Sequence, residues 1–166
     1  MFAEKFKIVP VANALDISAA TAYTDSIKMS NFHKATFIIQ LDATIAGADS
    51  HLWAYSGAAD ATYTSPLPFK YAFGGAATGT ALCDVLSAWT SNLSSGTPAA
   101  VHITFGTYPN YMMIVEVDAA DMDMANQEEW LALGFLDTDT GCLGTVVVTA
   151  ILEPRYTANR SATALA

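Results

Sequence analysis

Apolar and polar residues alternate most regularly between Ala35 and Ile45. One face of this run holds Ala35, Phe37, Ile39, Leu41, Ala43 and Ile45, and the other holds Lys34, Thr36, Gln40, Asp42 and Thr44, with Ile38 as the exception. Because successive side chains of a strand point to opposite faces of the sheet, this period of two predicts a strand with one buried face. A slip of one residue would expose the whole apolar set, so we expect a single pairing register.

Two further runs have the composition of long strands. Residues 111–117 follow a turn-forming segment, and residues 145–152 are rich in β-branched side chains and apolar on both faces, which favours burial on both sides. Shorter strands are expected at residues 6–11, 22–29, 51–55, 101–105 and 130–135. Clusters of Gly, Pro and Ser separate these segments, as turns do. About eight short antiparallel strands predict an all-β fold, a β-sandwich or jelly roll.

One or two short helices are expected to interrupt the strands. Residues 80–93 place six apolar side chains on one face at helical spacing: Ala81, Leu82, Val85, Leu86, Trp89 and Leu93. A shorter helical turn is expected after Asp121 or Asp123, because a carboxylate can cap the free amides at a helix start. We expect one β-sandwich domain over residues 1–160. Residues 161–166 have no periodicity and are expected to form a flexible tail, or an arm that orders on a neighbour.

The composition indicates a surface that is covered by other proteins. The chain has 166 residues, the size of one domain, and only 14% of them are charged although 52% are hydrophobic. No apolar run approaches 18 residues, so we expect the extra apolar area to be hidden in an assembly and not in a membrane. The first ten residues include Glu4, Lys5 and Lys7 and lack the pattern of a signal peptide, so secretion by that route is not expected.

The net charge of −9 is unevenly distributed. No Lys or Arg occurs between Lys70 and Arg155, whereas that span holds Asp84, Glu116, Asp118, Asp121, Asp123, Glu128, Glu129, Asp137, Asp139 and Glu153. Such an acidic stretch repels phosphate, so direct binding of nucleic acid is not expected. A basic protein surface would be attracted instead.

Two acidic segments are candidates for a metal site. Residues 118–129 are rich in oxygen ligands, but Met122, Met124 and the absence of Gly break the pattern of a calcium-binding EF-hand loop. We favour a solvated capping loop there and an ordinary turn at residues 137–141. Cys83 and Cys142 have no metal-ligand spacing and are expected to be free, buried thiols. We therefore predict no metal and no cofactor.

Catalytic patterns are weak in this sequence. Glu116 and Asp118 would point to the same face of a strand, but exposed like charges explain the pair equally well. His33, His51 and His102 are far apart in the sequence, and neither a nucleophile elbow nor a nucleotide-binding fingerprint is present. We predict that the protein is not an enzyme.

Aromatic residues are numerous, and most are expected to fill the core. Tyr108 and Tyr111 flank a Pro-Asn turn, and Tyr156 follows Arg155, so these side chains are placed where loops emerge. Tyr and Arg are common anchors of protein interfaces. We therefore predict Tyr108, Tyr111, Arg155 and Tyr156 as partner-contact residues, with core filling as the alternative for any single aromatic.

Short motifs along the chain resemble a family of small structural proteins of tailed bacteriophages. They are the Lys-Ala-Thr strand of residues 34–41, the run Ile-Val-Glu-Val-Asp of residues 114–118 with its acidic turn, and the closing Glu-Pro-Arg-Tyr of residues 153–156. The family's Gly-Phe-Asp after the acidic turn is replaced here by residues 127–130, Gln-Glu-Glu-Trp, which puts the local turn geometry in doubt.

The resemblance implies a role in the virion, beside the major capsid protein. We expect a capsid decoration or cement protein on the capsid surface, as a homotrimer, that binds neither nucleic acid nor membrane. Three alternatives stay open: another virion part (a tail-tube, head-completion or fibre-base subunit), a carbohydrate-binding surface module that uses Tyr108 or Tyr111, and a metal-dependent hydrolase that uses the acidic turn.

Overall fold

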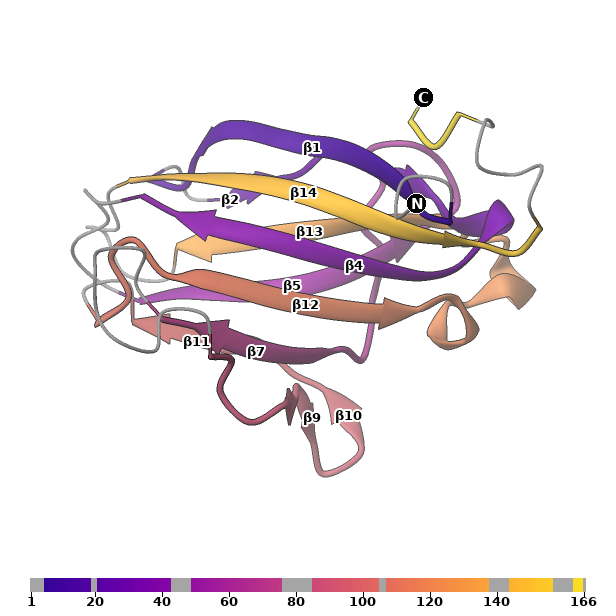
Figure 1. Ribbon diagram of the computed structural model, residues 1–166. Coiled ribbons are helices and arrows are strands. Elements are labelled where there is room, and N and C mark those ends of the chain that lie inside the picture. The colour runs from indigo at the N-terminus through magenta and orange to yellow at the C-terminus, as the bar shows by residue number, and fades with distance from the viewer. Residues whose placement is uncertain are drawn as a thin grey trace.

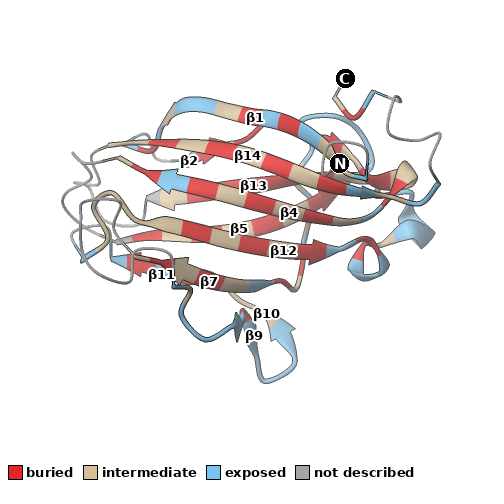
Figure 2. Ribbon diagram, viewed as in Figure 1, coloured by how far each residue is buried: buried red, intermediate tan, exposed pale blue. Residues whose placement is uncertain are grey.

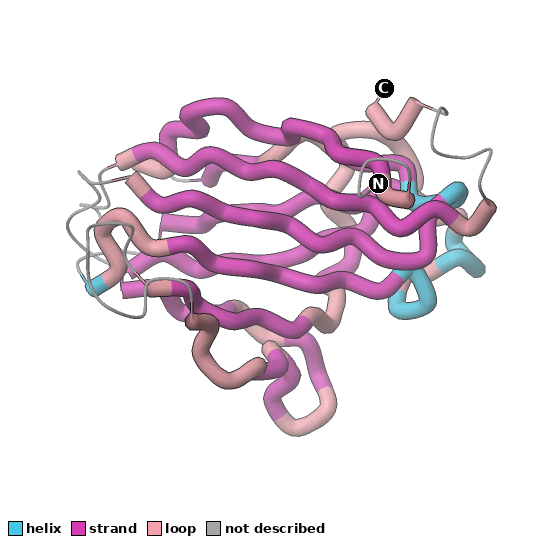
Figure 3. Tube along the Cα trace, in the orientation of Figure 1, coloured by secondary structure: helices cyan, strands magenta, loops and turns pink. Residues whose placement is uncertain are grey.

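The fold is built from two antiparallel β-sheets that pack face to face (Figure 1). A computed structural model of the chain describes residues 5–18, 21–42, 49–75, 85–104, 107–137, 144–156 and 163–165. Within these residues the regular structure is almost entirely strand, with short 3-10 turns and no α-helix (Figure 3). The prediction of an all-β sandwich is therefore confirmed.

The strands divide between two sheets and a small hairpin. Sheet A has the order β1 (Lys7–Asp16), β14 (Thr145–Pro154), β4 (Phe32–Leu41), β12 (Met112–Asp118), β7 (Lys70–Gly74) and β8 (Thr90–Ser91). Sheet B has the order β11 (Val101–Thr104), β5 (Asp49–Gly57), β13 (Trp130–Asp137) and β2 (Thr21–Tyr23), with β3 (Ile27–Lys28) also paired to β13 and β6 (Ser65–Pro66) to β5. β9 (Leu93–Ser94) and β10 (Thr97–Pro98) form the hairpin.

The strand order is that of a jelly roll. If β7, β8 and the hairpin are set aside, sheet A reads β1-β14-β4-β12 and sheet B reads β2-β13-β5-β11. Numbered along the chain as eight strands, with β3 continuing β2 along β13, these orders become 1-8-3-6 and 2-7-4-5. All consecutive strands except 4 and 5 therefore lie in different sheets, as in a double Greek key. The segment between β5 and β11 is an insertion that widens sheet A by two strands and carries the projecting hairpin (Figure 1).

The core lies between the sheets and follows the predicted alternation. In β4 the side chains of Ala35, Phe37 and Ile39 have no exposed surface, whereas the residues between them are partly exposed. Ala43 and Ile45 lie outside the described residues. β14 was expected to be buried on both faces, but only its inner face is buried, because nothing in the described chain covers the outer face of sheet A. Each large apolar side chain fully buried in this way contributes about 1.5–3 kcal/mol.

The helix predicted at residues 80–93 is wrong for residues 85–93, and residues 80–84 lie outside the described part of the chain. Leu86 bridges to Gly74, and β8 and β9 follow within eight residues. Val85, Trp89 and Leu93, which were expected to face the core, are 54%, 45% and 47% exposed. Their spacing of four residues fits one face of a helix but also one side of an extended chain, so the pattern could not separate the two.

The sequence correctly predicted one acidic cap, Asp123, and did not predict a second one, Asp118. Asp123 caps the 3-10 turn Met124–Asn126 by accepting a hydrogen bond from the Asn126 backbone N–H at 3.2 Å. Asp118 caps the turn Ala119–Asp121 in the same way, through the Ala120 N–H at 2.9 Å. A third 3-10 turn, Met29–Asn31, leads into β4. The acidic segment is thus a pair of capped turns at one end of the sandwich.

The end of the chain returns to the body of the molecule. Ala164 is 2% exposed within the core cluster, and its carbonyl accepts a hydrogen bond from the Lys28 N–H at 2.8 Å. Residues 163–165 therefore differ from the free tail that we expected. The hydrogen bond between Lys28 and Ala164 holds them in place and satisfies a backbone donor at the start of the Met29–Asn31 turn.

Candidate functional site

The centre of the outer face of sheet A is mostly apolar. Strand register places the outward side chains of this central part in three rows that cross β1, β14, β4, β12 and β7, and a fourth, charged row of Lys34, Asp118 and Glu153 borders them at one end. We call the apolar and hydroxyl-bearing members the aliphatic face: Ile8, Pro10, Thr36, Ile38, Met112, Ile114, Val147, Thr149 and Ile151. In the three rows only Glu116 and Lys70, at one corner, carry a charge. Solvated faces of antiparallel sheets normally present polar side chains, so this face is unusual.

The aliphatic face is accessible in the isolated chain. Figure 2 shows buried and partly exposed residues alternating along β14, β4 and β12 on the side toward the viewer. Ile8 is 50% exposed. The central residues Ile38 and Ile114 are partly exposed and are neighbours in the ladder.

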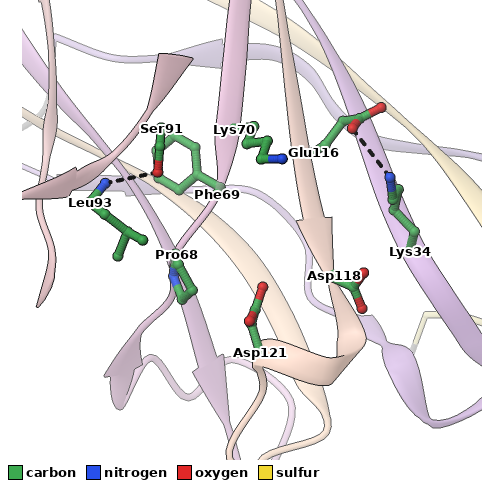
Figure 4. Close-up of a pocket in the computed structure, with 9 residues that line it drawn as sticks. All are labelled: Lys34, Pro68, Phe69, Lys70, Ser91, Leu93, Glu116, Asp118 and Asp121. Atoms are coloured by element: carbon green, nitrogen blue, oxygen red, sulfur yellow. Dashed lines mark hydrogen bonds and ion pairs between the residues drawn. The ribbon is translucent and has the colours of Figure 1, made fainter. Parts of the chain in front are cut away.

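A pocket of about 280 Å³ opens beside the charged corner of this face (Figure 4). It is lined by Lys34, Pro68, Phe69, Lys70, Ser91, Leu93, Glu116, Asp118 and Asp121. The Lys34 ammonium lies 3.3 Å from a Glu116 carboxylate oxygen, and each side chain is about one-third exposed. The pocket therefore mixes two ammonium groups with three carboxylates, and such exposed pairs contribute little to stability.

The carboxylates of this pocket have structural partners. Glu116 and Asp118 do lie on the same outer face of β12, as expected, but Glu116 pairs with Lys34 and Asp118 caps a turn. Burial raises the pKa of Asp121, and the nearby negative charge of Asp118 raises it further. A shifted carboxyl at an exposed turn, without a nucleophile beside it, fits a crowded acidic end better than an acid–base pair.

The predicted contact residues Tyr108 and Tyr111 are packed together at an edge of the core. The Tyr108 ring stacks on Phe73, with centroids 4.3 Å apart and an interplanar angle of 6°, and meets Tyr111 edge-on at 5.2 Å. Both tyrosines are partly buried against the core cluster. Tyr108 and Tyr111 therefore pack against the core, which was the alternative given for any single aromatic residue.

Arg155 and Tyr156 lie together just after β14, which ends at Pro154 as expected for a residue without an amide hydrogen. The Arg155 backbone N–H donates to the Asn31 carbonyl at 2.9 Å, and its Nε donates to the Phe32 carbonyl at 3.0 Å. Tyr156 is 73% exposed. Arg155 is thus tied to the start of β4, and Tyr156 projects from that anchor.

The outer face of sheet B carries a group of aromatic rings that the sequence reasoning assigned to the core. We call this group the aromatic face: Tyr23, Trp53, Tyr55, Tyr63 and Trp130. Trp53 and Tyr55 stack at 5.9 Å with an interplanar angle of 27°, and Tyr23 stacks on Tyr63 at 3.7 Å and 8°. The signal that could have revealed the face is the alternation of residues 51–55, in which ring-bearing residues at odd positions flank Leu52 and Ala54.

Two histidines, His51 and His102, continue this face at its β11 edge. His51 and His102 are directly paired across β5 and β11, and their rings lie 4.7 Å apart. Among the described residues, no three His, Cys, Asp or Glu side chains are arranged to hold a metal ion. Cys83, Cys142 and most of the 137–141 turn lie outside the described ranges. In the part of the chain that the structure describes, no helix has the length and apolarity needed to cross a membrane.

Neither the protein-family models nor the curated proteins include a match to this chain. The two outer faces of the sandwich are therefore its candidate binding surfaces.

Proposed function

We propose that the protein is a structural subunit of a tailed-phage virion, a decoration or cement protein that binds the outside of the capsid. The aliphatic face would lie against the major capsid protein or a neighbouring subunit. The motif resemblance to small phage structural proteins supports the proposed class of assembly, and the aliphatic face is the surface that we propose for the contact.

The single observation that carries the proposal is the chemistry of the aliphatic face. Ile38, Ile114 and Ile151 occupy outward positions in the middle of a six-stranded sheet, where water-facing strands favour polar residues. A contiguous apolar surface of this kind marks an interface. Burying it against a partner would release ordered water without leaving an unpaired charge.

The distribution of charge is compatible with this arrangement. Acidic caps gather at the end of the sandwich that carries the turns after β12, and the middle of the aliphatic face has none. The acidic end would steer the subunit toward a basic capsid surface while the uncharged centre makes close contact. Because a subunit that binds only the assembled shell stabilises it by mass action, its removal lowers the shell's stability.

Particles that lack the protein test the proposal. We expect virions assembled without it to release their DNA at a lower temperature than complete virions, and added purified protein to restore the difference. Thermal release measured with a DNA-binding dye on both particle types is the readout. Identical release curves, or absence of the protein from purified particles, would contradict a cement role.

A charge placed on the aliphatic face tests the surface itself. Ile38→Glu should abolish binding to particles, because it would bury an unpaired carboxylate at the contact. Ala125→Glu adds the same charge on an exposed turn and should bind normally. Circular dichroism on both variants establishes that each is folded. Normal binding of Ile38→Glu would move the contact away from sheet A.

The number of copies per particle separates this proposal from other virion parts. A cement protein on the shell would be present in hundreds of copies, whereas a head-completion or fibre-base subunit would follow the low symmetry of the neck or tail. Quantitative mass spectrometry against the major capsid protein gives the ratio.

A further inference from the structure

We infer that the aromatic face of sheet B is a binding platform for a neutral oligosaccharide. This site lies on the opposite side of the sandwich from the aliphatic face, so it does not depend on the capsid role and would remain open if sheet A were covered (Figure 1).

The rings lean over the sheet instead of standing away from it. Gly134 faces outward between Trp53 and Tyr23 in the β5-β13-β2 ladder. A Cβ atom at Gly134 would come within 2.8 Å of the Tyr23 ring and 3.1 Å of the Tyr55 ring. The absence of a side chain at this position therefore lets two rings close over the strand, and Ala132, the preceding outward residue of β13, has only a small, buried side chain. Rings that lie down on a sheet form a broad, shallow surface.

The rings are also held in place. Tyr63 reaches the face from the turn after β5, where it stacks on Tyr23 and shares a hydrogen bond with Ser26. At the other end, the Lys28 ammonium lies 5.7 Å from the centre of the Trp130 ring while it pairs with Glu129 at 2.7 Å. A platform that is already ordered loses little conformational entropy when it binds a ligand.

The charge around this face disfavours nucleic acid, another common ligand of stacked aromatic rings. Aromatic surfaces also bind single-stranded nucleic acid, but those sites track the phosphates with positive groups. Here the chain carries a net charge of −9, and Asp25 and Asp60 lie close enough to Tyr63 to help raise the pKa of its hydroxyl, after the larger effect of burial. A polyanion would be repelled. A neutral ligand would not.

A neutral sugar chain fits an ordered aromatic surface that repels polyanions. The electron-rich faces of Trp53 and Tyr55 attract the polarised C–H bonds on the flat side of a sugar ring. The Tyr55 hydroxyl is protonated at neutral pH, where it can donate a hydrogen bond, and burial raises its pKa further above the ordinary value. The carboxylates of Asp25 and Asp60 at the rim can accept hydrogen bonds from sugar hydroxyls. Binding is non-covalent and needs no metal.

The test uses the purified full chain and a panel of neutral hexasaccharides: cellohexaose, laminarihexaose, maltohexaose and mannohexaose. Polygalacturonate serves as the charged comparison. We expect at least one neutral sugar to change the tryptophan fluorescence with a saturable, micromolar-to-millimolar Kd, confirmed by calorimetry, and polygalacturonate to have no effect. Absence of binding across the neutral panel would overturn the inference.

Variants place the binding on the face. Trp53→Ala and Tyr55→Ala should each weaken sugar binding about tenfold, because each removes one stacking surface. Trp89→Ala is the matched control, since Trp89 is an exposed tryptophan that precedes β8 of the opposite sheet, and it should bind sugar normally. Trp53→Phe should recover most of the affinity by restoring a ring.

Two outcomes would assign the face differently. Equal sugar affinity of Trp53→Ala and the unmodified protein would place the sugar elsewhere. Concentration-dependent self-association that is lost in Trp53→Ala, without sugar binding, would make the face a contact between protein chains. Thermal unfolding of every variant shows whether a loss reflects the site or the fold.

Discussion

Glu128 is the only charged side chain buried among the described residues, at 5% exposure, and it joins two strands of sheet B. The Ser56 hydroxyl donates to one carboxylate oxygen at 2.5 Å, and the Ser65 hydroxyl donates to the other at 3.1 Å. Ser56 lies in β5 and Ser65 in β6, so the carboxylate bridges a paired strand and its short partner. A buried charge is tolerated here because hydrogen bonds replace its water.

Removing this carboxylate tests its structural role. We expect Glu128→Ala to lower the free energy of unfolding by about 1–3 kcal/mol, because the fully buried Ser56 hydroxyl loses its partner. The neighbouring Glu129→Ala removes only the exposed pair with Lys28 and should cost less than about 1 kcal/mol. Urea unfolding of both variants gives the comparison. Equal losses would mean that the hydrogen bonds of Glu128 contribute no more than a surface ion pair.

Asp121 should make stability depend on pH in a definite direction. Burial and Asp118 raise its pKa in the folded protein above the ordinary value of 3.8, so the folded state holds the proton more tightly than the unfolded state does. The stability due to this proton is present below pH 3.8 and is lost as pH rises through the raised pKa. Asp121→Asn should therefore stabilise the protein at neutral pH, by about 0.5 kcal/mol or less for an exposed group, and lose that advantage in acid. Thermal unfolding at several pH values checks the sign, which would be reversed if the pKa were lowered instead.

At the scale of the element, β4 shows how one strand serves two surfaces. From Ala35 to Leu41 its odd-numbered residues are buried in the core, and Thr36 and Ile38 between them belong to the aliphatic face. The same alternation in β5 separates the aromatic face from core residues Leu52 and Ala54. Because the period is two, each strand commits half of its side chains to folding and leaves half for contacts with other molecules.

Adjacent isoleucines of β4 provide a direct test of this division. Ile39→Ala should cost about 2–5 kcal/mol of folding stability, because Ile39 has no exposed surface and its loss leaves a cavity. Ile38→Ala, one residue earlier on the partly exposed face, should cost about 1 kcal/mol. Chemical unfolding of the purified variants measures both. A cost for Ile38→Ala as large as that for Ile39→Ala would show that the aliphatic face is packed within the isolated molecule.

At the scale of the whole molecule, one core cluster joins both sheets and reaches the end of the chain, from Val9 in β1 to Ala164. The two outer faces are chemically different, aliphatic on sheet A and aromatic on sheet B. The hairpin of β9 and β10 projects beyond the sandwich, and its base is held by Asn92, whose side chain accepts from the Phe69 N–H and donates to the Leu67 and Ala99 carbonyls. A rigid body with distinct sides suits a subunit that binds different molecules on each side.

Deletion of residues 163–166 should weaken the whole fold. It removes the buried Ala164 side chain and leaves the Lys28 N–H without its acceptor, which together cost about 1–3 kcal/mol. Thr163→Ala, a change at an exposed position of the same segment, is the matched control and should have little effect. Differential scanning calorimetry compares the two, and an unchanged melting temperature after deletion would show that the contact contributes nothing to folding.

The sequence by itself determined the strands whose apolar pattern continues over a long stretch of the chain. Strict alternation predicted β4, and β-branched runs predicted β12 and β14, because burial on one face requires side chains of one kind at every second position. Asp123 was recognisable as a cap because that role depends only on neighbouring amides, whereas the cap at Asp118 was not predicted. The absence of any complete catalytic motif, the acidic balance and the low charge content were likewise properties of the chain alone.

Only the tertiary structure decided which surfaces those elements present. β7 was not expected, because its five residues lie among turn signals and its extended form depends on its ladders with β12 and β8. The helix predicted at residues 80–93 was wrong over residues 85–93, because spacing by four fits both a helix and an extended chain, and pairing with β7 stabilises the extended form there. The aromatic face was assigned to the core because a ring has the same hydrophobic signature on either side of a sheet, and strand order alone determines which side is covered.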